Sequence, residues 1–98
     1  MWTGTLLLDL MLGDVHSLKE KRSVVRPVVA ALVKVGVSAA EVGHLDLHRR
    51  ALVGAAVVAA DPAHCREVLA TCERLVAGRP EVEVLSTRTQ LIKEGDED

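Results

Sequence analysis

The chain has 98 residues, of which 49% are hydrophobic and 27% are charged, and its formal net charge is −2. This length supports one domain with one core, and this composition excludes a disordered chain. The longest apolar runs fall short of the roughly 20 residues of a membrane span and no signal peptide is evident, so we expect a cytoplasmic protein without membrane association.

The first segment, residues 2–12, alternates between two kinds of side chain. Leucines stand at positions 6, 8, 10 and 12, and polar residues such as Thr5 and Asp9 stand between them. A repeat of two residues is typical of a strand with one buried face.

Residues 17–36 have the pattern of a helix. Ser17 and Glu20 have the spacing of a capping box, so the helix is expected to begin at Leu18, and Gly36 is expected to end it. Pro27 should kink this helix, or the regular part begins only near Ser23. The predicted apolar stripe contains Leu18, Val25, Val28, Val29, Leu32 and Val33.

Two further strands are expected over residues 37–42 and 51–60, joined by a hairpin over residues 43–50. The second of them is apolar on both faces. One face carries Val53, Ala55 and Val57, and the other carries Leu52, Ala56 and Val58.

The second helix is expected between Asp61, as its N-cap, and Gly78, with Pro62 at its first position. Cys65 and Cys72 lie on its apolar stripe, roughly 10 Å apart along the helix, which is too far for a disulfide. A last strand covers residues 81–92, and the acidic residues 94–98 are expected to be disordered beyond a domain that spans residues 1–93.

The predicted order of strand, helix, strand, strand, helix, strand is typical of one α+β architecture. It favours a ferredoxin-like βαββαβ fold, in which both helices cover one face of a four-stranded antiparallel sheet. In this fold the end of the first strand and the hairpin of residues 43–50 lie at the same edge.

That edge collects positive charge. Residues 19–50 have a net charge of +4, against −4 for residues 51–98. The helix start and the hairpin therefore predict an anion-binding or RNA-binding edge. The alternative is that Asp46 or Glu41 pairs with the arginines and only anchors the hairpin. The candidate binding residues are Lys19, Lys21, Arg22, Arg26, His44, His48, Arg49 and Arg50.

Three segments, SLKEKRSVVRPVV, VSAAEVGHLDLHRRA and VAADPAHCREVL, resemble the YlxP-like family of small bacterial proteins. The resemblance implies a ferredoxin-like fold and, because members are often encoded beside factors for translation initiation and ribosome maturation, a role linked to RNA or the ribosome. The family's hairpin pattern falls on Glu41, His44, Asp46, Leu47 and Arg50. Where the family usually has Trp, this chain has His48.

Other chemistries have little support in the sequence. Trp2 is the one aromatic residue of the Phe, Tyr and Trp kind, so a sheet that stacks bases is excluded. His44 and His48 with Asp46 do not complete a zinc site, and no nucleophile or glycine-rich phosphate loop is present. We therefore expect no enzyme activity, no metal and no cofactor.

The sequence thus predicts a non-enzymatic protein that contacts the phosphates of structured RNA or of the small ribosomal subunit. The alternative is a homodimeric interaction module without a nucleic-acid role. A homodimer would use the open face of the sheet, where Leu7, Met11 and Leu85 are expected beside the outward residues of the 51–60 strand.

Overall fold

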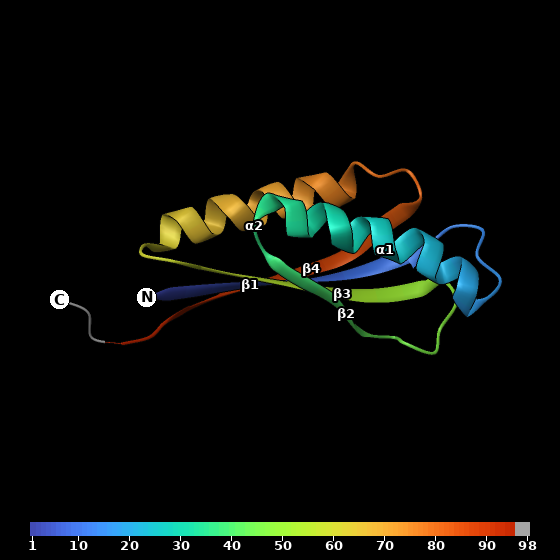
Figure 1. The fold of residues 1–98 in the computed structure, drawn as a ribbon, viewed down its shortest axis with the longest axis horizontal. Coiled ribbons are helices and arrows are strands. Elements are labelled where there is room, and N and C mark those ends of the chain that lie inside the picture. The colour runs from blue at the N-terminus through green and yellow to red at the C-terminus, as the bar shows by residue number, and fades with distance from the viewer. Residues whose placement is uncertain (96–98) are drawn as a thin grey trace.

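The computed structural model describes residues 1–95 as a four-stranded sheet with two helices on one of its faces (Figure 1). The βαββαβ order is confirmed, and with it the ferredoxin-like fold. Residues 96–98, which make up most of the tail predicted to be disordered, lie outside the described residues. The elements are β1 (Trp2–Leu12), α1 (Leu18–Val35), β2 (Ser38–Gly43), β3 (Arg50–Ala59), α2 (Pro62–Ala77) and β4 (Val82–Lys93).

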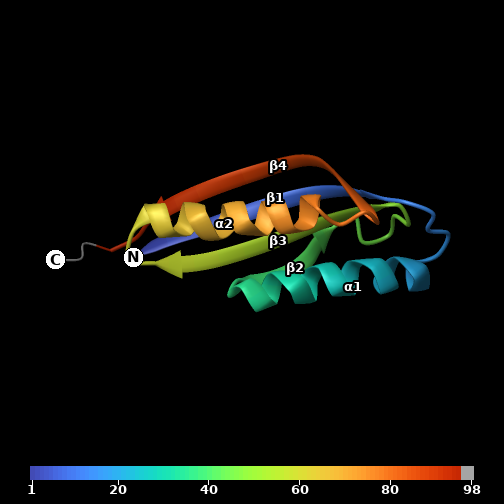
Figure 2. The ribbon, with the colours of Figure 1, turned by 90° about the horizontal axis from the view of Figure 1, so that it is seen from above.

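The strands lie in the order β2-β3-β1-β4, and every neighbouring pair is antiparallel. Since β1 and β2 both run antiparallel to β3, they are parallel to each other. The end of β1 and the β2–β3 connection therefore meet at one edge, as Figure 2 shows at the end of the sheet opposite the N-terminus. There the Leu12 amide donates to the Arg49 carbonyl at 2.8 Å.

The core lies between the sheet and the helices. The even-numbered leucines of β1 are at most 1% exposed, and they pack with Val28 and Leu32 of α1 and Leu69 of α2. Burying each leucine contributes about 1.5–3 kcal/mol. Gly4 permits this packing, because a Cβ there would come within 2.9 Å of the Leu69 Cδ1 atom.

Both helices begin where the sequence predicts. The Ser17 hydroxyl accepts from the Glu20 amide at 3.1 Å, and the Asp61 carboxylate accepts from the His64 amide at 2.8 Å. Gly36 ends α1 at a φ of 111°, which favours glycine.

The expectation that regular helix begins only near Ser23 is wrong, because α1 runs from Leu18 to Val35 with Pro27 inside it. Proline removes one backbone donor, and the residues buried on either side of it, such as Val25 and Val28, hold both halves of the helix on the sheet.

The buried stripe of α1 differs from the predicted one. Leu18 and Val33 are 38% and 51% exposed, whereas Lys21 is buried. The prediction for the cysteines is confirmed, because Cys65 and Cys72 are both free and buried. Burial raises the pKa of the Cys72 thiol, so it stays protonated.

Candidate functional site

Lys21 joins α1 to the β2–β3 hairpin from inside the protein. Its side chain is 3% exposed, and its Nζ atom lies 2.7 Å from the Glu41 Oε2 atom of β2. The same ammonium donates to the His44 carbonyl at 2.7 Å. Two partners thus satisfy a buried charge that would otherwise be strongly unfavourable.

His44 turns the chain at this point. It has a φ of 56°, and its carbonyl also accepts from the Leu47 amide, which closes the turn. Positive φ is uncommon for a residue with a side chain, and the contacts of its carbonyl stabilise it here. The helix start and the hairpin therefore meet in space, as the topology predicted.

A second charge cluster lies on the open face of the sheet, opposite the helices. One terminal nitrogen of Arg50 donates to both carboxylate oxygens of Asp9, at 2.7 and 2.8 Å. The His44 Nε2 atom is 3.4 Å from the same carboxylate. The hydrogen bond from Arg50 lowers the pKa of the Asp9 carboxyl, and it outweighs the opposing effect of burial.

Arg49 fixes the end of β1 to the hairpin. Its Nε atom donates to the Gly13 carbonyl at 2.9 Å and to the Leu12 carbonyl at 3.3 Å. The exposed side chain stands at a shallow hollow of about 570 Å³ that the β1–α1 loop and the hairpin share. His16, Asp46 and His48 also line it.

The remaining candidate cations lie on the outer flank of α1. Lys19, Arg22 and Arg26 are exposed, and no ion pair within residues 1–95 engages them. Arg22 and Arg26 border a hollow of about 410 Å³ beside Glu41, whose charge is already paired with Lys21. These three residues are called the α1 flank below.

The N-terminus of α1 is already occupied by the chain's own groups. Ser17 caps the Glu20 amide, and the Glu20 carboxylate accepts from the His16 amide at 2.8 Å. An anion at this edge would therefore depend on side-chain donors rather than on the helix end.

The predicted binding residues thus fall into three groups. Lys21 and Arg50 are engaged by Glu41 and Asp9, and His44 lies against Asp9. Arg49 and His48 are exposed at the hairpin. The α1 flank is exposed without internal partners. Of the two carboxylates expected to anchor the hairpin, Glu41 does so through a lysine, and no ion pair of the described residues involves Asp46.

Asp9 is the functional-site residue that sequence reasoning missed as a partner. The sequence held a signal, because the fold places β1 beside β3. Asp9 and Arg50 then lie two positions apart on the same face, since Met11 pairs with Arg50 in the register. Two oppositely charged side chains in this diagonal arrangement on neighbouring antiparallel strands are close enough to form an ion pair.

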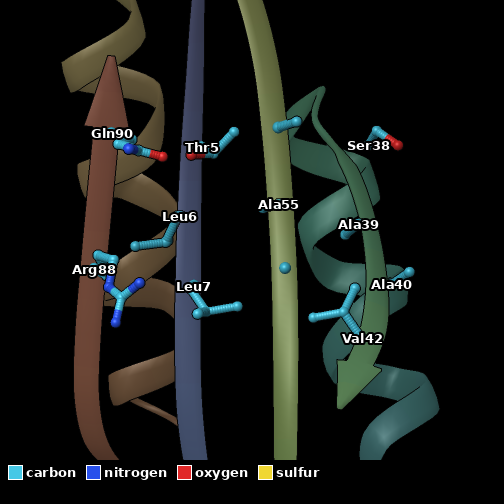
Figure 3. A pocket seen from close by; sticks show the side chains of 12 residues that line it. Thr5, Leu6, Leu7, Ser38, Ala39, Ala40, Val42, Ala55, Arg88 and Gln90 are labelled. Carbon is cyan, nitrogen blue, oxygen red and sulfur yellow. The ribbon is translucent and has the colours of Figure 1, made fainter. Parts of the chain in front are cut away.

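The open face of the sheet is hollowed across β2, β3 and β1. The hollow has a volume of about 420 Å³, and Figure 3 shows Leu7 and Val42 leaning toward each other over β3. Between them lies Gly54, which pairs with Leu7 on one side and Ala40 on the other. Arg88 and Gln90 of β4 form the polar side of the hollow.

Within residues 1–95, no group of three or more His, Cys, Asp or Glu side chains is arranged to hold a metal ion. Neither of the described helices has the length and apolarity of a transmembrane segment. Trp2 lines a hollow with Val58 and Lys93 at the end of the sheet far from the hairpin, so it lies away from the cationic edge.

Comparison with known proteins gives a family and a fold. A family model described as "Protein of unknown function (DUF503)" matches residues 3–89. No curated protein matches the chain. The chain is similar to the crystal structure of a variant of SnoaB, a cofactor-independent oxygenase from Streptomyces nogalater, with a TM-score of 0.53 and 15% identity over 97% of this chain and 95% of that one. At this identity the likeness shows the fold alone.

Proposed function

Because the chain belongs to the DUF503 family, whose function is unknown, its role must be inferred from its surfaces, and we propose that it is a non-enzymatic protein that binds the phosphates of structured RNA. The contact surface is the α1 flank (Lys19, Arg22, Arg26) together with Arg49 and His48 of the hairpin. The small ribosomal subunit is the expected source of this RNA.

The observation that carries the proposal is the imbalance of charge on the exposed surface of α1. Lys19, Arg22 and Arg26 are exposed and without ion pairs in the described residues, and the one acid of the helix, Glu20, is turned back to the His16 amide. A cationic surface that its own protein does not neutralise attracts polyanions and gains affinity by releasing their counterions.

Lys21 and Arg50 are left out of the proposed surface, although both were predicted to belong to it. Lys21 forms an ion pair with Glu41, and Arg50 forms one with Asp9. They position the hairpin, and through it Arg49, beside the helix. Withdrawing either from its carboxylate to reach a phosphate would leave that carboxylate without its cation.

The proposed mode of recognition reads shape and backbone rather than base sequence. Trp2, the one Phe, Tyr or Trp residue of the chain, lies far from this edge, so base stacking on such a ring is not available. Binding through lysine and arginine alone predicts weak affinity that falls steeply with salt. The resemblance to YlxP-like proteins supports an RNA-linked role.

The test is co-sedimentation of the purified protein with small ribosomal subunits and, separately, with their naked RNA, over a series of salt concentrations. The wild type is expected to bind saturably and to release as salt rises. An Arg22→Gln/Arg26→Gln variant should bind more weakly, and its salt slope should decrease by about two.

The matched control is Arg66→Gln/Arg74→Gln, which removes the same charge from the exposed surface of α2. This control should bind like the wild type. If both variants lose affinity equally, the loss follows from net charge alone and contradicts the proposed surface. If the wild type binds neither the subunit nor its naked RNA at low salt, the proposal itself is contradicted. The homodimeric module, which uses the open sheet face, would then be the better account.

A further inference from the structure

We propose that the open face of the sheet is the interface between two copies of this chain. The occupant of the hollow over β3 is then the same face of a second copy, related by a two-fold axis. This inference goes beyond the proposed RNA contact and uses the opposite side of the molecule.

The first argument is the kind of side chain that stands at the outward positions. A sheet face that contacts water normally carries polar residues at these positions. On β3 the outward positions after Arg50 are Leu52, Gly54, Ala56 and Val58. β2 adds Ser38, Ala40 and Val42, whose side chain lies over Gly54. β3 thus has the composition of a strand that is covered on both faces.

The second argument is exposure. In the single chain Val42, Val58 and Ile92 remain 54%, 61% and 43% exposed on this side of the sheet. Leu7 and Met11 of the central strand β1 are half-buried at outward positions between them. The apolar surface is therefore continuous over β2 and β3, whereas on β1 and β4 apolar side chains alternate with polar ones such as Thr5, Arg88 and Gln90. An exposed apolar patch of this kind marks an interface.

The third argument is charge. The outward charged residues of the described strands are Asp9 and Arg50, which pair with each other, and Glu83 and Arg88, both on β4. These charges cancel, so a second copy of the same face is not repelled. The α1 flank is cationic and would repel its own copy, which makes it unsuited to a symmetric interface.

The fourth argument is area. The four strands have 11, 6, 10 and 12 residues. At about 4.8 Å between strands and about 3.3 Å per residue their face covers roughly 600 Å², so two copies that overlap over most of it would bury about 1,000 Å² together. Specific interfaces begin near this size. Two sheets packed face to face would also fill both hollows, which is the usual way to cover an apolar sheet face.

The experiment is sedimentation equilibrium of the wild type and three variants at tens of micromolar. The wild type should approach twice its monomer mass of 10.5 kDa. Val42→Glu and Val58→Glu place a charge on the open face from two different strands, and both should return the mass to that of the monomer. Circular dichroism and urea unfolding show that each variant is folded.

Val33→Glu is the matched control, because Val33 is 51% exposed on α1 and receives the same substitution. It should remain dimeric. The proposal is overturned if the wild type stays monomeric at these concentrations. It is also overturned if folded Val42→Glu and Val58→Glu proteins both remain dimeric, which would assign the contact to another face.

Discussion

The side chain of Lys21 lies on the buried stripe of α1, where an amphipathic helix carries apolar residues. It lies in line with Val25, Val28 and Leu32, and its exposed fraction is 3%. A lysine is accepted there because Glu41 and the His44 carbonyl receive its charge. The residue therefore connects a helix, a strand and a hairpin at one point.

Replacing Lys21 with Met is expected to lower the free energy of unfolding by about 2–3 kcal/mol. The methionine fills the space, but Glu41 loses its cation and the His44 carbonyl loses a donor. Glu41 is 24% exposed, but the Oε2 atom that faces Lys21 is buried, so water replaces the lost ammonium only in part. Urea unfolding of the variant measures it.

Lys19→Met is the control, since Lys19 is exposed two residues away, and it should change stability by less than about 0.5 kcal/mol. Combining Lys21→Met with Glu41→Leu should recover part of the loss, because no unpaired carboxylate remains. Equal effects of the two lysine substitutions would show that the ion pair contributes nothing to stability.

The ion pair between Asp9 and Arg50 connects β1 to β3 on the open face. The folded protein lowers the pKa of Asp9 below its ordinary value of 3.8 through the hydrogen bond from Arg50. Because the pKa of Asp9 is lower in the folded than in the unfolded protein, the pair contributes its full stabilisation at pH values above the unfolded pKa. This stabilisation is lost as the pH falls through the folded pKa.

The expected outcome is that wild type and Asp9→Asn differ in stability near neutral pH and become more alike as the pH falls below about 4. Arg50→Gln removes the hydrogen bond that lowers the pKa of Asp9, so its stability should likewise approach that of the wild type at low pH. Arg50→Lys keeps a cation beside Asp9, so its stability should differ less from that of the wild type at neutral pH and change less relative to it as the pH falls. Urea unfolding over a pH series provides the comparison. A stability difference that stays constant down to about pH 2 would contradict the assignment.

The elements themselves were largely predictable from the sequence, because local chemistry determines them. Ser17 and Asp61 mark the helix starts through caps, and the alternating leucines of β1 mark the buried face. The two caps and the alternating pattern depend only on residues that are close in sequence. Strand and helix order then restricts the fold to few topologies.

The candidate site was less predictable, because it depends on which charges find partners across the fold. The sequence placed Lys21 and Arg50 at the correct edge but could not show that Glu41 and Asp9 bind them. For Lys21 a signal existed, since it stands four residues before Val25 on the helical repeat. Periodicity favours a buried Lys21 and its charge favours an exposed one, and only the distant partner Glu41 decides for burial, whereas the apolar Leu18 is exposed.

The α1 flank and the open sheet face lie on opposite sides of the protein. The helices cover one face of the sheet, and the hollow lies on the other (Figures 1 and 3). A dimer joined through the sheets would therefore carry its helices outside. The two α1 flanks would lie about 30 Å apart, since each layer is about 10 Å thick.

This arrangement predicts bivalent binding of long RNA. A structured RNA that reaches both flanks should bind the wild type about ten-fold to a hundred-fold more tightly than it binds the monomeric Val42→Glu variant, because the second contact is intramolecular. A short hairpin that covers one flank should bind both proteins alike. Fluorescence anisotropy with the two RNAs at one salt concentration measures the difference.

Ala63→Glu separates valence from charge in this experiment, because it adds the same negative charge at an exposed position of α2, away from the α1 flank and the open face. It is expected to keep the dimer and to retain the advantage on long RNA that Val42→Glu loses. If Ala63→Glu and Val42→Glu lose affinity equally, the effect is electrostatic and the dimer does not assist binding. If both RNAs favour the wild type equally over Val42→Glu alone, the open face itself contacts RNA, and the two surfaces are not independent.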